Sequence, residues 1–132
     1  MRFPSASTGG LPERLRQAYE VCLAAQKRAC ANIKAGMTGV DADLLAREPI
    51  EDSGFGENFG HGLGHGVGLA VHEAPRLSTE STDTLEVGHV VTIEPGIYLE
   101  GLGGVRIEDL AVVREHGVDL LTSFPKELIE VG

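Results

Sequence analysis

Two stretches near the N-terminus have the spacing of amphipathic helices. Apolar side chains recur every three or four residues at Leu15, Ala18, Tyr19, Cys22, Ala25, Ala29 and Ile33. This spacing predicts a helix over residues 12–34, with Pro12 in its first turn and Gly36 as its stop. Residues 38–52 predict a second helix with Thr38 as its N-cap, which Pro49 should kink or end.

The remainder of the chain has the pattern of short strands. Residues 90–98 and 105–113 are β-branched and apolar runs that predict largely buried strands, placed over 90–94 and 105–113, with Pro95 and Tyr98 shaping the exit from the first. Further strands are expected near Phe59, over 67–72 and over 119–122, with a turn at 115–117 before the last. Helices followed by strands predict an α+β fold with the helices packed on one face of a curved antiparallel sheet. No repeat or linker divides the sequence, so we expect one domain over residues 1–132.

Composition argues against nucleic acid and membrane partners. The chain has 20 acidic and 11 basic residues, and its formal net charge of -9 disfavours binding to phosphate backbones. No apolar run approaches the roughly 18 residues that a membrane span needs. Cys22 and Cys30 lie about 12 Å apart along one predicted helix, too far for a disulfide. Reduced thiols, and a start without the features of a secretion signal, favour a cytoplasmic location.

Residues 61–73 are the most informative stretch for function. They hold three of the five histidines, His61, His65 and His72, in a run with glycine at positions 62, 64, 66 and 68. A glycine inside a helix costs about 1 kcal/mol relative to alanine, so this run is an irregular strand or a loop. Such a backbone can bend sharply or pass close to a bound group. A histidine here is either a satisfied core residue or a ligand.

Two glutamates stand inside the predicted buried strands. An ionised carboxylate at Glu94 or Glu108 must be paired, hydrogen-bonded or metal-bound, because isolated burial costs many kcal/mol. Alternation puts Arg106 and Glu108 on one strand face and Ile107 and Asp109 on the other. Arg106 can pair with either glutamate, which leaves one carboxylate over. One histidine with two glutamates is a ligand set that suits manganese, cobalt, iron or zinc.

Three sequence blocks follow one another in a characteristic order. They are Gly64-His65-Gly66-Val67-Gly68 with Val71-His72-Glu73, then Thr92-Ile93-Glu94-Pro95-Gly96-Ile97-Tyr98, then Gly104-Val105-Arg106-Ile107-Glu108-Asp109. The blocks closely resemble the C-terminal half of the pita-bread metallopeptidases, a family with methionine aminopeptidases, Xaa-Pro aminopeptidases, prolidases and creatinase. The second and third blocks are more similar to the Xaa-Pro branch than to the methionine branch. The resemblance implies half of a pita-bread fold over nearly the whole chain.

The resemblance also implies a role for each site residue. His65 and Glu94 would be metal ligands, and Glu108 a carboxylate shared between two metals. His61 and His72 would be substrate-side catalytic histidines that steady the scissile carbonyl or move protons. The implied reaction is hydrolysis of an N-terminal Xaa-Pro bond by a metal-activated water, with two divalent ions of manganese, cobalt, iron or zinc. The implied substrate is a peptide with proline in second position.

Two ligands of the family's complete site have no counterpart in these 132 residues. They are aspartates of an upstream Asp-x-Gly motif that is followed by Ser-Asp-x-Thr-Arg, and this pair of motifs does not occur here. We therefore expect a truncated chain that binds at most one ion well and is inactive or very weak alone. The alternative is a catalytically dead relative that binds a peptide or protein. A half-domain exposes a sheet edge and an apolar face, which favours a homo-oligomer or pairing with the missing half.

Overall fold

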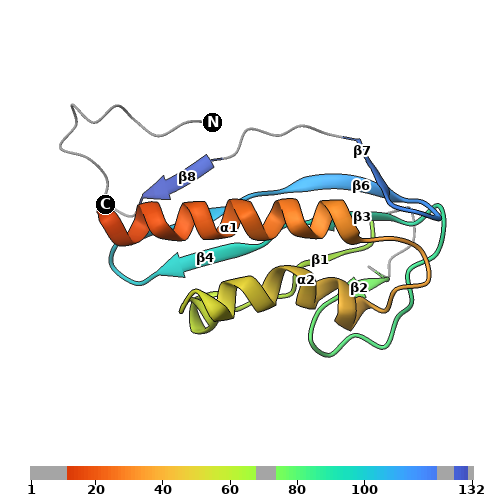
Figure 1. The fold of residues 1–132 in the computed structure, drawn as a ribbon, viewed down its shortest axis with the longest axis horizontal. Helices are drawn as coiled ribbons and strands as arrows, with labels where there is room; N and C mark the ends of the chain where they lie inside the picture. Colours follow the sequence, from red (N-terminus) through yellow and green to blue (C-terminus); the bar gives the residue numbers. More distant parts are fainter. Residues whose placement is uncertain (1–11, 68–73, 122–126, 131–132) are drawn as a thin grey trace.

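Two helices and eight short strands make up the part of the chain that the computed structural model describes, residues 12–67, 74–121 and 127–130 (Figure 1). The helices are α1 (Glu13–Asn32) and α2 (Gly39–Asp52), followed by a single 3-10 turn, η2 (Gly56–Asn58). The strands are β1 (Gly64–His65), β2 (Arg76–Leu77), β3 (Val90–Ile93), β4 (Gly96–Leu99), β5 (Gly103–Arg106), β6 (Asp109–Val113), β7 (Val118–Leu120) and β8 (Glu127–Glu130). They pair in the orders β1-β2, β3-β6-β7 and β4-β5-β8, and every pair is antiparallel.

The hydrophobic core lies between the helices and the strands. α1 packs on α2 and on β3, β4 and β5, and the ribbon shows both helices on the same side of the strands (Figure 1). The buried face of α1 contains the stripe predicted from the sequence, from Leu15 through Cys22 to Ala29. Burial of this stripe against the sheet contributes to the hydrophobic free energy that stabilises the fold. The predicted α+β class is confirmed.

Both helices form, with one correction to each. α1 ends at Asn32, two residues earlier than predicted, because Ile33 adopts extended backbone angles (φ -69°, ψ 136°). The Thr38 side chain caps α2 as predicted and accepts a hydrogen bond from the Asp41 N–H at 3.1 Å. Pro49 does not end α2, which continues to Asp52. The proline removes one N–H from the hydrogen-bond ladder, and it does so in the last turn, where little helix remains to be lost.

Both apolar runs, 90–98 and 105–113, are interrupted, the first where the strand predicted over 90–94 ends. Residues 90–98 divide into β3 and β4 at Glu94 and Pro95, and residues 105–113 divide into β5 and β6 at Ile107 and Glu108. Pro95 has no N–H to donate to a ladder, which breaks the regular pairing. Both candidate glutamates therefore lie in the interruptions rather than inside regular strands.

Other predicted strands differ more. No strand forms near Phe59, because its carbonyl accepts a hydrogen bond from the Arg47 side chain and its ring packs under that guanidinium. The predicted strand over 67–72 lies beyond Val67 outside the described residues, and the strand that forms is the shorter, earlier β1. The turn at 115–117 is confirmed, closed by the Arg114 N–H on the Gly117 carbonyl at 2.7 Å. Of the two helices described, neither is long and apolar enough to cross a membrane.

Candidate metal and substrate site

Strands β3 and β4 pair with β6 and β5 in one continuous register and together form a long antiparallel hairpin. Glu94 and Glu108 lie opposite each other where this hairpin is interrupted. Ile93 at the end of β3 pairs with Asp109 at the start of β6. Continuing this register by one residue places Glu94 opposite Glu108, and pairing resumes in the same register between β4 and β5. Opposite residues of an antiparallel pair have Cβ atoms about 5 Å apart. The backbone thus brings together two carboxylates that are 14 positions apart in the sequence.

The two carboxyl groups are close enough for the negative charge of one to disfavour ionisation of the other. The pKa of Glu108 is raised, first by burial and then by the negative charge of Glu94, which is also its hydrogen-bond partner. Arg106 and His65 act in the opposite direction. Arg106 Nε lies 3.9 Å from Glu108 Oε1, with side chains 48% and 36% exposed, so the predicted ion pair forms with Glu108 and is weak. A cation between the carboxylates would relieve their repulsion in place of a proton.

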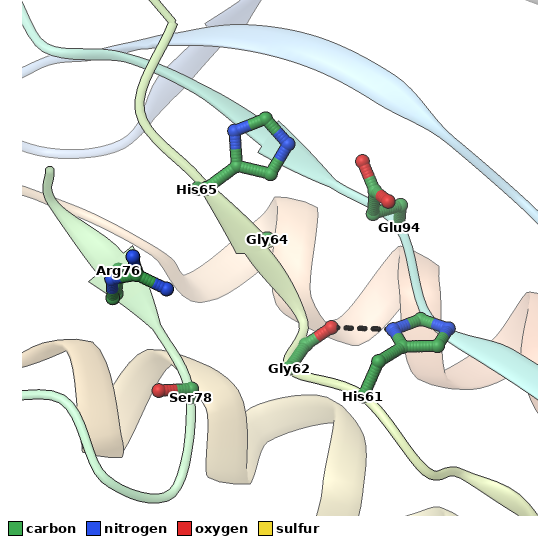
Figure 2. Close-up of a pocket in the computed structure, with 7 residues that line it drawn as sticks. All are labelled: His61, Gly62, Gly64, His65, Arg76, Ser78 and Glu94. Atoms are coloured by element: carbon green, nitrogen blue, oxygen red, sulfur yellow. Dashed lines mark hydrogen bonds between the residues drawn. The ribbon is translucent and has the colours of Figure 1, made fainter. Parts of the chain in front are cut away.

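His65 is fixed beside β3 by backbone and side-chain hydrogen bonds. Its N–H donates to Thr92 Oγ1 at 3.1 Å, and the adjoining segment is held by the Glu94 N–H on the Leu63 carbonyl at 2.7 Å. His65 Nδ1 lies 3.0 Å from the Gly66 carbonyl, which places the ring proton on Nδ1 and the lone pair on Nε2. This arrangement is common in metal-binding histidines. Figure 2 shows the imidazole and the Glu94 carboxylate on the same side of their strands.

The glycines of the histidine run have a packing role in this structure. A Cβ on Gly64 would lie 1.9 Å from the Thr92 carbonyl oxygen. A Cβ on Gly66 would lie 2.0 Å from the Ala74 carbonyl oxygen. Only glycine lets the run pass this close to the chain on either side. The close approach expected from the sequence is therefore, at these two positions, an approach to neighbouring backbone.

His61 is oriented by two hydrogen bonds. Its Nδ1 lies 2.7 Å from the Gly62 carbonyl and its Nε2 lies 3.0 Å from Tyr98 Oη. The carbonyl can only accept, so Nδ1 carries the proton and Nε2 accepts from the phenol. Burial raises the pKa of Tyr98, which keeps the phenol protonated as a donor. Tyr98 was predicted to shape the strand exit and not as a site residue, because its contact with His61 depends on where β4 lies in the fold.

A cavity of about 220 Å³ joins several of these residues (Figure 2). Its lining is His61, Gly62, Gly64, His65, Arg76, Ser78 and Glu94. Three of the predicted site residues, His61, His65 and Glu94, thus share one cavity, and Glu108 lies opposite Glu94 in the strand register. His72 lies outside the described residues. Arg76 in β2 and Ser78 just after it were not predicted, because the segment that follows the histidine run has no recognisable motif.

The side chains of His65, Glu94 and Glu108 suit a divalent ion, but they do not converge on one position. Within the described ranges no group of three or more His, Cys, Asp or Glu side chains is arranged to hold a metal. Glu94 and Glu108 are together, and His65 is their neighbour. Two mutually repelling carboxylates and an imidazole with its proton on Nδ1 are the ligand chemistry that manganese, cobalt, iron and zinc accept.

Sequence comparison identifies the family. The model of metallopeptidase family M24 matches residues 5–115, and the chain therefore belongs to this family. The Xaa-Pro dipeptidase of Pyrococcus furiosus is 50% identical over 121 residues, which are 92% of this chain and 35% of that protein. The peptidase YqhT of Bacillus subtilis, whose name marks it as uncharacterized, is 49% identical over 125 residues, 95% of this chain and 35% of its own length.

Comparison with solved structures agrees. An Xaa-Pro dipeptidase from Bacillus anthracis superposes with a TM-score of 0.83 at 51% identity, over 89% of this chain and 33% of that one. The prolidase from Pyrococcus furiosus gives 0.83 at 50% identity, over 89% and 35%. The predicted resemblance to the Xaa-Pro branch of the pita-bread enzymes is confirmed. The chain spans about a third of the length of the relatives it matches.

Proposed function

We propose that this chain supplies the histidine and glutamate side of the active site of an Xaa-Pro peptidase. In this proposal His65, Glu94 and Glu108 are metal ligands, and His61 and His72 face the substrate. The observation that carries it is the placement of Glu94 opposite Glu108, with the pKa of Glu108 raised by burial and by Glu94. Membership of a metallopeptidase family supports the same assignment.

Each residue has a task in the proposed reaction. A bound divalent ion supplies a Lewis acid that activates water. Glu94 and Glu108 would hold the ion as carboxylates, and its positive charge would relieve their mutual repulsion. His65 presents Nε2, because its Nδ1–H is bonded to a carbonyl. His61, held by Tyr98 at 3.0 Å, lines the cavity where it can bind the substrate carbonyl or relay a proton.

The proposed substrate is a peptide with proline in second position. Relatives that are about half identical to this chain are named Xaa-Pro dipeptidase. We carry this specificity to the present chain as part of the proposal.

The 132-residue chain alone is proposed to be inactive or very weak and to hold at most one ion well. It contains residues that match three of the family's metal ligands but no Asp-x-Gly followed by Ser-Asp-x-Thr-Arg. The missing carboxylates would come from the rest of a longer protein or from a paired chain. A chain that never gains activity when so completed would be the binding module considered above.

A chimera tests the proposal. The matching 121-residue segment of the Pyrococcus furiosus dipeptidase is replaced by the corresponding part of this chain, and hydrolysis of Ala-Pro is measured with added manganese or cobalt. We expect an active chimera and an inactive isolated chain. His65→Ala and Glu108→Gln should abolish activity of the chimera, and Glu57→Gln, at an exposed glutamate outside the site, should not.

Two results would overturn this account. One is a folded chimera without activity, or one that keeps its activity after His65→Ala. The other is turnover by the isolated chain at about 1 per second, an ordinary enzyme rate. The His65→Ala chain then serves as the control for contaminating peptidase.

A further inference from the structure

A buried ion pair on α2, Asp43 with Arg47, forms hydrogen bonds to the backbone at His61 and on both sides of it. Asp43 and Arg47 are one turn apart, and their side chains are 0% and 12% exposed. Arg47 donates from Nε to Asp43 Oδ2 at 2.6 Å and from Nη2 to Oδ1 at 3.1 Å, a forked contact with both carboxylate oxygens. Buried charges are tolerated when they are paired in this way and their remaining hydrogen-bonding capacity is used.

The other hydrogen bonds of this ion pair are made to residues 59–63, the histidine segment. Arg47 Nη1 donates to the Phe59 carbonyl at 3.0 Å and Nη2 donates to the His61 carbonyl at 2.8 Å. Asp43 Oδ1 accepts from the Leu63 N–H at 2.9 Å. The guanidinium carbon also lies 4.1 Å from the centre of the Phe59 ring. Backbone groups at every second residue from 59 to 63 are therefore bound to one ion pair.

Phe59 and Leu63 anchor the ends of the segment in the core, but few backbone hydrogen bonds fix the residues between them. It lies between η2 and the two-residue strand β1, so no sheet ladder fixes residues 59–63. Among the described residues, the backbone bonds of this segment are the Phe59 N–H on the Gly56 carbonyl at 3.3 Å and the Glu94 N–H on the Leu63 carbonyl at 2.7 Å. Gly60 has open space where a side chain would be, and it offers no packing contact. The direction of the His61 side chain thus depends on the carbonyls that Arg47 binds.

We propose that Asp43 and Arg47 are positioning residues, which hold the backbone from Phe59 to Leu63 and thereby aim His61 at Tyr98. The geometric part of this proposal stands on the contacts above. Its importance for catalysis rests on the proposed function of His61. A single lysine nitrogen cannot bind two carbonyls and both carboxylate oxygens at once, so charge alone would not replace Arg47.

NMR spectroscopy of the metal-free 132-residue chain tests the geometry without any requirement for activity. In the wild type we expect cross-peaks between the His61 and Tyr98 rings and a ¹⁵N pattern with the His61 proton on Nδ1. Arg47→Lys and Arg47→Met should both lose these ring cross-peaks. Asp43→Asn should shift the Leu63 amide signal, since the acceptor of its hydrogen bond changes.

Arg28→Lys is the matched control. Arg28 on α1 pairs with Glu48 on α2 at 3.4 Å, and this pair is exposed, with side chains 43% and 55% accessible. We expect Arg28→Lys to keep the His61 signals unchanged. The proposal is overturned if Arg47→Lys keeps the wild-type cross-peaks, or if Arg28→Lys loses them as well. If Arg47→Met does not fold, the lysine variant alone decides.

Discussion

The two segments that carry the candidate site are held in place by different means. Glu94 and Glu108 are set opposite each other by the backbone register of a long antiparallel hairpin. His61 lies in a segment without a ladder and is held by side chains of α2. Side-chain changes on a helix should therefore move the histidine, while the glutamates should move only when the backbone itself is displaced.

α1 also supports the glutamate segments through side-chain hydrogen bonds, but through fewer of them. Cys22 Sγ donates to the Pro95 carbonyl at 3.2 Å, and Gln26 Nε2, one turn further, donates to Asp109 Oδ2 at 2.6 Å. Each helix thus places two polar side chains, four residues apart, under one site segment. The α1 contacts are made by neutral donors, one to each strand, whereas the α2 pair is charged and makes several. The difference predicts a graded response to substitution.

The largest effect is expected where the two segments meet. Gly64→Ala would put a methyl group 1.9 Å from the Thr92 carbonyl oxygen, so β1 must separate from β3. We expect a loss of about 2 kcal/mol or more in the free energy of unfolding, as for overpacking in a core. Gly60→Ala is the control, because nothing lies within 4 Å of its Cβ. Urea denaturation measures both, and equal losses would refute the close approach.

An intermediate effect is expected from α1. Gln26→Leu removes the donor to the buried Asp109 carboxylate and should cost about 1 to 3 kcal/mol. Gln17→Leu changes an exposed glutamine of the same helix and should stay within about 0.5 kcal/mol of the wild type. In the metal-free chain the cross-peaks between His61 and Tyr98 should survive Gln26→Leu. Loss of these cross-peaks would contradict the claim that α2, and not α1, orients His61.

The smallest effect at neutral pH concerns Cys22. Burial raises the pKa of its thiol to about 12, from an ordinary value of 9.0. The folded state holds this proton more tightly than the unfolded state, so the contribution to stability is complete below pH 9.0 and is lost as the pH rises toward 12. At pH 8 iodoacetamide should label the half-buried Cys30 well before Cys22, as read by mass spectrometry. Equal labelling of the two thiols in the native chain would contradict this burial.

The sequence predicted what depends on periodicity and motif. The helix stripe, the Thr38 cap, the turn at 115–117 and the family resemblance all rest on local patterns, and each is confirmed. The interruption at Ile107 and Glu108 was missed because β-branched and apolar residues on both sides indicate one long strand. The grip of Arg47 on Phe59 and His61 could not be predicted, because it joins positions whose proximity depends on how η2 folds back on α2. The same contact explains why the prediction of a strand near Phe59 was wrong.

Metal binding tests the central claim most directly. The 132-residue chain is titrated with manganese(II), and the free ion is followed by its electron paramagnetic resonance signal. We predict one ion bound per chain, with affinity reduced about tenfold or more in each of His65→Ala, Glu94→Gln and Glu108→Gln. Glu57→Gln, at an exposed position, should bind as the wild type does. Equal binding by the wild type and all three site variants would contradict the claim that His65, Glu94 and Glu108 form one metal site.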